Sequence, residues 1–170
     1  QMCIRDRFTN ATVHTIGNMH NYRYSSAGDV GIININNPAG WQPRAWVVVR
    51  AGDGEISNIA YHIHADRDPM VGRRVCISGA SSYATECGLV TQTNVSVTYL
   101  HPQVTVAGLF QINACAHPGD SGAPVFADNI AYGIISGGTI AGSGAECITF
   151  AQPIVEAENL MRVNVAHQAP

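Results

Sequence analysis

The chain contains no lysine, and charge of either sign is scarce. All nine basic residues are arginines, charged residues make up 12% of the 170 residues, and the formal net charge is −3. Such a chain lacks the basic surface that binding to a phosphate backbone requires. It also lacks a run of 18 or more apolar residues, which a membrane-spanning helix would need. We therefore expect neither a nucleic acid nor a membrane among its partners.

The sequence gives little indication of a metal site. His62 and His64 alternate and would share one face of a strand. Two imidazoles in that arrangement could bind a metal ion, but a third ligand is not evident nearby. We expect the two histidines to face solvent, and we expect neither a metal ion nor another cofactor.

The composition favours a β-rich core with many turns. Hydrophobic residues make up 46% of the chain, with 17 glycines and eight prolines. The predicted strands are residues 29–34, 45–50, 57–62, 74–78, 88–99, 104–112, 123–126, 131–136 and 148–150. After Pro153 the pattern changes to acidic residues followed by apolar residues spaced three to four apart, which predicts one short helix.

The most specific motif is Gly-Asp-Ser-Gly at residues 119–122, within Cys-Ala-His-Pro-Gly-Asp-Ser-Gly-Ala-Pro. A glycine-rich turn can direct the backbone N–H groups of Gly119 and Ser121 toward one point, where they would stabilise an oxyanion. The hydroxyl of Ser121 would still need a base to become a nucleophile. Four residues of this kind also form ordinary turns, so the motif has to be weighed with the rest of the chain.

Three other segments accompany the motif in a fixed order. Asp29 stands at the entrance to an apolar β-type run, Cys76 and Cys87 flank a Gly-, Ser- and Ala-rich hairpin, and Ile-Ser-Gly-Gly is followed by Cys147. Together the four segments resemble the chymotrypsin-like serine proteases, and within them the secreted bacterial streptogrisin and α-lytic type. The resemblance covers about residues 8–165.

The resemblance implies an all-β fold of two antiparallel six-stranded β-barrels, the first incomplete, with a short C-terminal helix. Residues 8–68 would form the partial N-terminal barrel, and residues 69–165 the C-terminal barrel with the helix. It also implies two disulfides, Cys76–Cys87 and Cys115–Cys147. Paired cysteines indicate an oxidising compartment, so we expect a secreted protein.

The activity implied by the resemblance is that of a serine endopeptidase acting on polypeptides through an acyl-enzyme. Ser121 would be the nucleophile, Asp29 would orient a histidine base, and the N–H groups of Gly119 and Ser121 would form the oxyanion hole. Ser136, Gly137 and Gly138 would line the substrate pocket. We expect the protein to act as a monomer.

The side chains around the expected pocket predict its specificity for the substrate residue before the scissile bond (P1). Asn113 is not acidic, so nothing favours arginine or lysine, and Ile135 stands where a glutamate-selective relative would have a histidine. We expect an apolar P1 residue of medium size. Glu146 is an acidic residue beside the expected pocket disulfide, and it could alter this preference.

Residues 1–7 differ in kind from the rest. Met-Cys-Ile-Arg-Asp-Arg resembles translated sequencing-adapter DNA, so we expect residues 1–7 to be foreign and the natural chain to be truncated here. The Ala-Gly-His-Cys segment that carries the histidine of this family is absent. We therefore expect this fragment to lack its base and to be inactive. His14 and His20 are the alternative bases, and a pseudoprotease that only binds peptides or proteins is the alternative function.

Asp120 needs a partner if it is buried beside the nucleophile. In the resembling proteases an arginine follows the first hairpin cysteine and pairs with this aspartate, but here the position is Ile77. Arg73 would lie on the same strand face by period-two alternation, and we expect it to be the partner.

Overall fold

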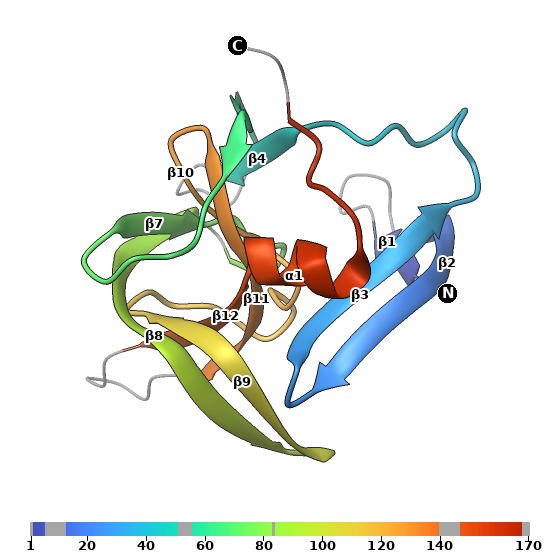
Figure 1. Cartoon of the computed structure of the whole chain (residues 1–170). Coiled ribbons are helices and arrows are strands. Elements are labelled where there is room, and N and C mark those ends of the chain that lie inside the picture. The colour runs from blue at the N-terminus through green and yellow to red at the C-terminus, as the bar shows by residue number, and fades with distance from the viewer. Residues whose placement is uncertain (1, 6–12, 51–55, 83, 140–146, 168–170) are drawn as a thin grey trace.

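Six antiparallel strands close into a ring that forms the C-terminal half of the protein (Figure 1). The computed structural model describes residues 2–5, 13–50, 56–82, 84–139 and 147–167. In ring order, the strands are β10 (Pro124–Ala127), β7 (Arg74–Ile77), β8 (Glu86–Leu100), β9 (Gln103–Ile112), β12 (Ile148–Pro153) and β11 (Ile130–Thr139). Pairing of β10 with β11 closes the ring, and the short β6 (Ala65–Asp66) adds to β11 in parallel.

The inside of the ring is apolar because the inward-facing residues alternate along each strand. Val75, Ile77, Phe110 and Ile112 have none of their surface exposed, and they belong to one buried cluster. Burial of this kind is the main force that stabilises the ring.

The N-terminal part of the protein forms two smaller sheets. Strands β1 (Met2–Arg5), β2 (Val13–Ser25) and β3 (Gly28–Ile35) make a three-stranded sheet, and β4 (Trp46–Arg50) pairs with β5 (Ile56–His62). Within the described ranges these strands stay open, in keeping with an incomplete first barrel. The β4–β5 ribbon contacts the ring through a cluster of Val47, Ile63 and Phe126.

The single described helix, α1 (Ile154–Met161), continues directly from β12 and lies between the ring and β3 (Figure 1). Pro153 occupies its N-cap and Glu156 lies in its first turn, where an acidic side chain is favourable. Ala157 and Met161 are buried against Val30 of β3. The helix therefore joins the C-terminal ring to the sheet that carries Asp29.

The all-β class, the nine predicted strands and the helix are confirmed, with ends shifted by a few residues. Strand β2 was not predicted, because its mixture of polar and aromatic residues shows no clean alternation and most of its described side chains are exposed. Part of the segment expected to be foreign forms β1, which pairs with β2. That residues 1–7 are foreign stays a prediction.

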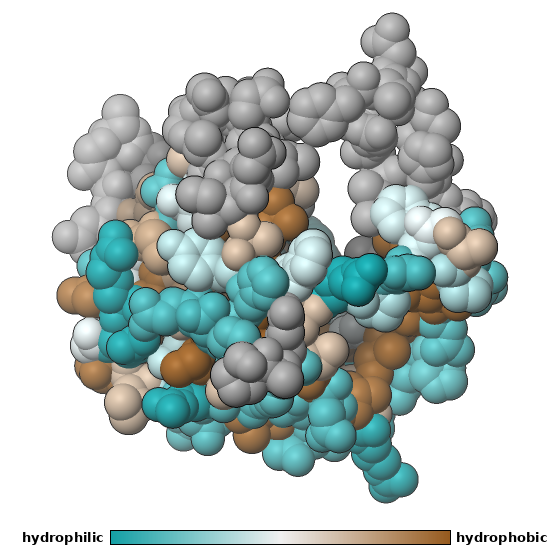
Figure 2. Space-filling model, turned by 90° about the horizontal axis from the view of Figure 1, so that it is seen from above, coloured by the Kyte–Doolittle hydropathy of each residue, from teal (hydrophilic) through white to brown (hydrophobic). Residues whose placement is uncertain are grey.

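The visible surface is mixed in character. Seen from above, hydrophobic residues are interspersed with hydrophilic ones over the described part of this face (Figure 2). Among the described helices and strands, no helix has the length and apolar character needed to cross a membrane.

Both expected disulfides are present. Cys76 and Cys87 lie directly opposite each other on β7 and β8, and Cys115 joins the loop after β9 to Cys147 at the start of β12. The bridged cysteines are separated in the sequence by 11 and 32 residues, respectively.

Removing the Cys115–Cys147 bridge should destabilise the protein more than removing Cys76–Cys87. The longer loop restricts the unfolded chain more, and the loop-entropy estimate gives about 4 kcal/mol for the longer loop against about 3 kcal/mol for the shorter. Urea unfolding of the two double Cys→Ala variants would measure the difference. Equal losses, or a larger loss for Cys76–Cys87, would contradict the loop-length argument.

Candidate functional site

Ser121 lies in a tight loop between β9 and β10. The Asp120 N–H donates to the His117 carbonyl at 2.9 Å, and the Ala123 N–H donates to the Asp120 carbonyl at 2.9 Å. Gly119 has φ +101°, and a Cβ there would lie 2.3 Å from the Ser81 hydroxyl. The positive φ favours glycine at this position, and the Ser81 hydroxyl occupies the space that a side chain would take. The loop leaves Ser121 exposed to solvent.

Two backbone donors of this loop are available to a ligand. Within the part of the chain that the structure describes, no hydrogen bond engages the N–H of Gly119 or of Ser121. These are the two groups that the motif predicts for an oxyanion hole.

Asp120 is buried, with 1% of its surface exposed, and its carboxylate holds the Ser121 loop in place. Its Oδ1 accepts the N–H groups of Ser81 at 2.6 Å and Ser82 at 3.2 Å. Its Oδ2 accepts the Ser82 hydroxyl and, at 2.9 Å, the His117 N–H. Burial raises the pKa of Asp120, but these hydrogen bonds, led by the one from the Ser82 hydroxyl, outweigh burial and leave the pKa below its ordinary value.

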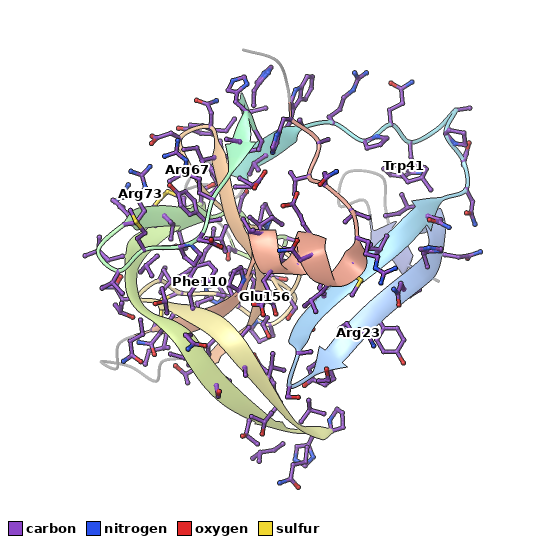
Figure 3. The ribbon with its side chains drawn as sticks, in the orientation of Figure 1. Arg23, Trp41, Arg67, Arg73, Phe110 and Glu156 are labelled. Carbon is purple, nitrogen blue, oxygen red and sulfur yellow. A yellow bond between two sulfur atoms is a disulfide. The ribbon has the colours of Figure 1, made fainter. Side chains whose placement is uncertain are left out.

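The expectation that Arg73 pairs with Asp120 is wrong. Arg73 lies beside β7 (Figure 3), forms an ion pair with Asp128 at 2.8 Å, and stacks over the ring of Tyr132 at 5.7 Å. Four neutral donors already satisfy the Asp120 carboxylate, so it does not need a cation. They approach it closely because residue 79 is a glycine: a Cβ there would lie 2.2 Å from the carboxylate.

Asp29 is held by a chain of hydroxyl groups. The Ser136 hydroxyl donates to Asp29 Oδ2 at 2.6 Å, and the Tyr99 hydroxyl lies 2.7 Å from Ser136 Oγ. Because the Ser136 proton points to Asp29, Tyr99 must be the donor to Ser136. Burial raises the pKa of Tyr99 most; the hydrogen bond with Ser136 lowers it by less, and the charges of Asp29 and Tyr24 raise it further. Tyr99 therefore stays a protonated donor at neutral pH.

The Ser121 loop and Asp29 are held by consecutive residues of β11. The Gly122 N–H donates to the Ile135 carbonyl at 2.8 Å, and the Ile135 N–H donates to the Ala123 carbonyl at 2.9 Å. Ser136, the next residue, binds Asp29. Strand β11 thus brings together two segments that lie 92 residues apart in the sequence.

A hollow of about 130 Å³ opens beside Ser121. Its lining consists of Ala116, His117, Pro118, Ser121, Ile135, Gly137 and Gly138. Of the three predicted pocket residues, Gly137 and Gly138 line the hollow, whereas the hydroxyl of Ser136 is directed to Asp29. A Cβ at Gly138 would lie 2.6 Å from the Ile148 carbonyl oxygen, so the wall requires glycine there. Glu146 lies outside the described residues.

A larger hollow of about 480 Å³ lies elsewhere, beside the Cys76–Cys87 disulfide. It contains neither Ser121 nor Asp29, and its lining includes Arg73, Arg74 and Asp128. Of these two hollows, the smaller is the candidate site, because it is the one that the Ser121 loop lines.

The two alternative bases lie away from Asp29. In the β2–β3 pairing Asp29 is opposite Tyr24, so the backbone of His14 lies ten residues further along β2, about 30 Å at the usual rise of a strand. His20 Nδ1 lies 3.2 Å from the side-chain amide of Asn34, five residues beyond Asp29. His62 and His64 belong to no group of three possible metal ligands in the described ranges.

The sequence interpretation missed Ser82 and Tyr99. Ser82 lies 38 residues from the carboxylate it binds, and Tyr99 lies 37 residues from Ser136. A single Ser or Tyr in a loop or a strand belongs to no sequence motif that would predict its hydrogen-bond partner. Only the folded structure therefore reveals these contacts.

Replacing Ser82 with alanine should make the protein more sensitive to acid. The lowered pKa means that ionised Asp120 stabilises the fold above its ordinary pKa of 3.8, and that this stabilisation is lost as pH falls through the folded-state pKa. Without the hydroxyl, the pKa of Asp120 rises, so acid unfolding should begin at a higher pH. The loss at pH 7 should be about 2 kcal/mol, as for other hydrogen bonds to a charged group.

The matched control is Ser81→Ala, because Ser81 donates to Asp120 through its backbone N–H, which the substitution leaves in place. Acid unfolding would be followed by circular dichroism, and stability at pH 7 by urea titration. Coincident acid-unfolding curves for the two variants would contradict the role given to the Ser82 hydroxyl.

Comparison with known sequences identifies the family of this chain. The sequence profile of the family called Trypsin matches residues 5–161. Streptogrisin-A of Streptomyces griseus is 36% identical over 133 residues, which are 76% of this chain and 40% of that protein. Streptogrisin-C of the same organism is 34% identical over 116 residues, 68% of this chain and 23% of that protein. The chain thus spans less than half the length of either relative.

Two solved structures have a similar fold. Cellulomonas bogoriensis chymotrypsin superposes with a TM-score of 0.76 at 28% identity, over 89% of this chain and 76% of the other. Thermobifida fusca protease A superposes with a TM-score of 0.72, also at 28% identity, over 85% and 72%. The chain therefore belongs to the trypsin family, and its fold is that of chymotrypsin.

Proposed function

We propose that the protein to which this chain belongs is a secreted serine endopeptidase, with Ser121 as nucleophile and Asp29 as the carboxylate that orients its histidine. The observation that carries the proposal is the joint anchoring of the Ser121 loop and Asp29 on Ile135 and Ser136 of β11. If the Ser121 loop and Asp29 had unrelated roles, nothing would require consecutive residues of one strand to bind both of them.

Each group has a defined part in acyl transfer. The Ser121 hydroxyl attacks the peptide carbonyl, and the N–H groups of Gly119 and Ser121 stabilise the oxyanion as the tetrahedral intermediate forms. Asp29 Oδ2 is engaged by Ser136, whereas Oδ1 has no hydrogen bond among the described residues. That oxygen is available to accept an imidazole N–H and to hold the tautomer that takes the proton of Ser121.

The base is the component that this chain does not supply. Neither His14 nor His20 approaches Asp29 along β2. We infer that a histidine upstream of the printed sequence completes the site, and that the 170-residue chain hydrolyses peptides negligibly. A pseudoprotease that binds peptides at the same edge without cleaving them is the alternative.

The substrate backbone would add to the open edge of β11. Residues from Ser136 to Thr139 pair on one side with β12, while the pairing with β10 ends at Ile134, so no described strand covers their other edge. An extended peptide can bind such an edge as an additional strand. Its P1 side chain would then enter the hollow against Ile135, Gly137 and Gly138.

Two disulfides support secretion, because such bridges persist in an oxidising compartment. The mixed surface in Figure 2 is compatible with the monomer that we propose.

Restoring the upstream coding sequence should convert Ser121 from an inert residue to a reactive one. We expect a fluorophosphonate to label the extended protein at Ser121, and the printed chain at least about a thousandfold more slowly, because loss of a triad member removes that much activation or more. Mass spectrometry of the labelled peptide identifies the site, and Ser121→Ala in the extended protein is the control.

Labelling of the printed chain at the rate of the extended protein would show that another residue serves as base. An extended protein that carries a histidine beside Asp29 but resists labelling would instead favour the pseudoprotease.

The extended protein should prefer a medium-sized apolar P1 residue. Of the described residues that line the hollow, only His117 can carry charge, and the wall includes the side chains of Ala116 and Ile135. On peptides that differ only at P1, kcat/KM for leucine or methionine should exceed that for arginine or lysine by roughly tenfold or more. Glu146→Gln tests whether the acidic residue beside Cys147 alters the ranking. A preference for arginine or lysine would overturn the assignment.

A further inference from the structure

Gln152 is a polar side chain with none of its surface exposed. It is the last but one residue of β12, immediately before α1. Its Oε1 accepts the backbone N–H of Asp29 at 2.9 Å, and its Nε2 donates to Glu156 Oε2 at 2.8 Å. A buried amide is costly unless it is hydrogen-bonded, so the occupation of both ends makes this link specific.

Two glycines with positive φ lie against the ends of the link. Gly28 has φ +147°, and a Cβ there would lie 2.8 Å from Gln152 Oε1 and 2.7 Å from Leu160 Cδ1. Gly108 has φ +76°, and a Cβ there would lie 2.9 Å from Glu156 Oε2. Glu156 lies beneath α1, toward the strands of the ring (Figure 3). The two glycines therefore allow strands β3 and β9 to approach the amide and the carboxylate directly.

Asp29 is consequently fixed at two points. Ser136 of β11 sets the direction of its carboxylate, and Gln152 of β12 sets the position of its backbone. The two holding residues belong to neighbouring strands, since Gln152 is paired with Ile134, two residues before Ser136. A carboxylate held at one end only could rotate or withdraw from the site.

We propose that Gln152 is a positioning residue that fixes Asp29 relative to Ser136 and, through β11, relative to Ser121. It acts without touching the substrate. The catalytic consequence rests on the function proposed above, whereas the hydrogen bond itself can be tested in the printed chain without any activity.

The first experiment observes the amide proton of Asp29 by NMR in the printed chain. In Gln152→Met, which keeps the length of the side chain but removes its oxygen, the signal should move upfield and exchange with solvent about tenfold faster. The double variant Gln152→Glu/Glu156→Gln keeps an oxygen for the Asp29 N–H and lets the new amide donate to the new carboxylate, so the signal should stay near its position in the parent chain. Glu156→Gln is the matched control, because an amide oxygen can still accept from Nε2.

Thermal unfolding of each variant separates a local change from a general loss of structure. If Gln152→Met does not fold, the double variant and Glu156→Gln still test the link, since both should retain the protected Asp29 amide. An Asp29 amide that keeps its position and exchange rate in folded Gln152→Met would overturn the proposal, as would loss of its protection in the folded double variant.

The second experiment measures kinetics in the extended protein that carries its histidine. Gln152→Met should lower kcat about tenfold and leave KM within about twofold, because it displaces a catalytic group and not the substrate. Glu156→Gln should stay within about twofold of the parent in both constants. A rise in KM with kcat unchanged would contradict a positioning role. If the parent protein itself hydrolyses nothing, the proposed function fails, and the NMR result still decides the role of Gln152.

Discussion

The hydrogen bond from Ser136 to Asp29 joins the two halves of the protein at the candidate site. Asp29 lies on the N-terminal sheet, whereas Ser136 and the Ser121 loop belong to the C-terminal ring. Neither half contains both groups, so the chemistry can exist only where β3 meets β11. The Tyr99 hydroxyl completes the arrangement, since it satisfies Ser136 Oγ while the serine proton remains directed at Asp29.

A second constraint is the burial of the Asp120 carboxylate under the Ser121 loop. An isolated charge in this position would be protonated or would unfold the loop. Here neutral donors from residues 81, 82 and 117 surround Asp120 and lower its pKa despite its burial. Two of these residues, Ser81 and Ser82, lie in the hairpin after β7, so the shape of the Ser121 loop depends on them as well as on its own glycines.

Patterns that are local in sequence predicted most of the fold. Apolar patterning predicted nine strands, and a proline followed by acidic residues predicted the helix. The two disulfides were predicted from the resemblance to the bacterial secreted proteases. Contacts over long separations were not predictable in this way. The partner of Asp120 was predicted to be Arg73 by strand alternation, but Arg73 pairs with Asp128. The actual donors, from Ser81, Ser82 and His117, lie in loops whose course no sequence pattern specifies. Likewise β2 has no clean alternation, because its described side chains are mostly exposed.

The link through Gln152 gives the C-terminal helix a reason to lie where it does. Burial of Ala157 and Met161 against Val30 would stabilise many orientations of a short helix, since apolar contact is not directional. The hydrogen bonds from the Gln152 amide to Glu156 and from the Asp29 N–H to Gln152 are directional, so they favour one orientation of the helix. The apolar face therefore supplies stability, while the buried amide sets the register between the helix and β3. It follows that a change in the helix could alter the position of Asp29 while leaving the hydrophobic cluster intact, which makes this terminal element part of the site's architecture and not merely a cover for the ring.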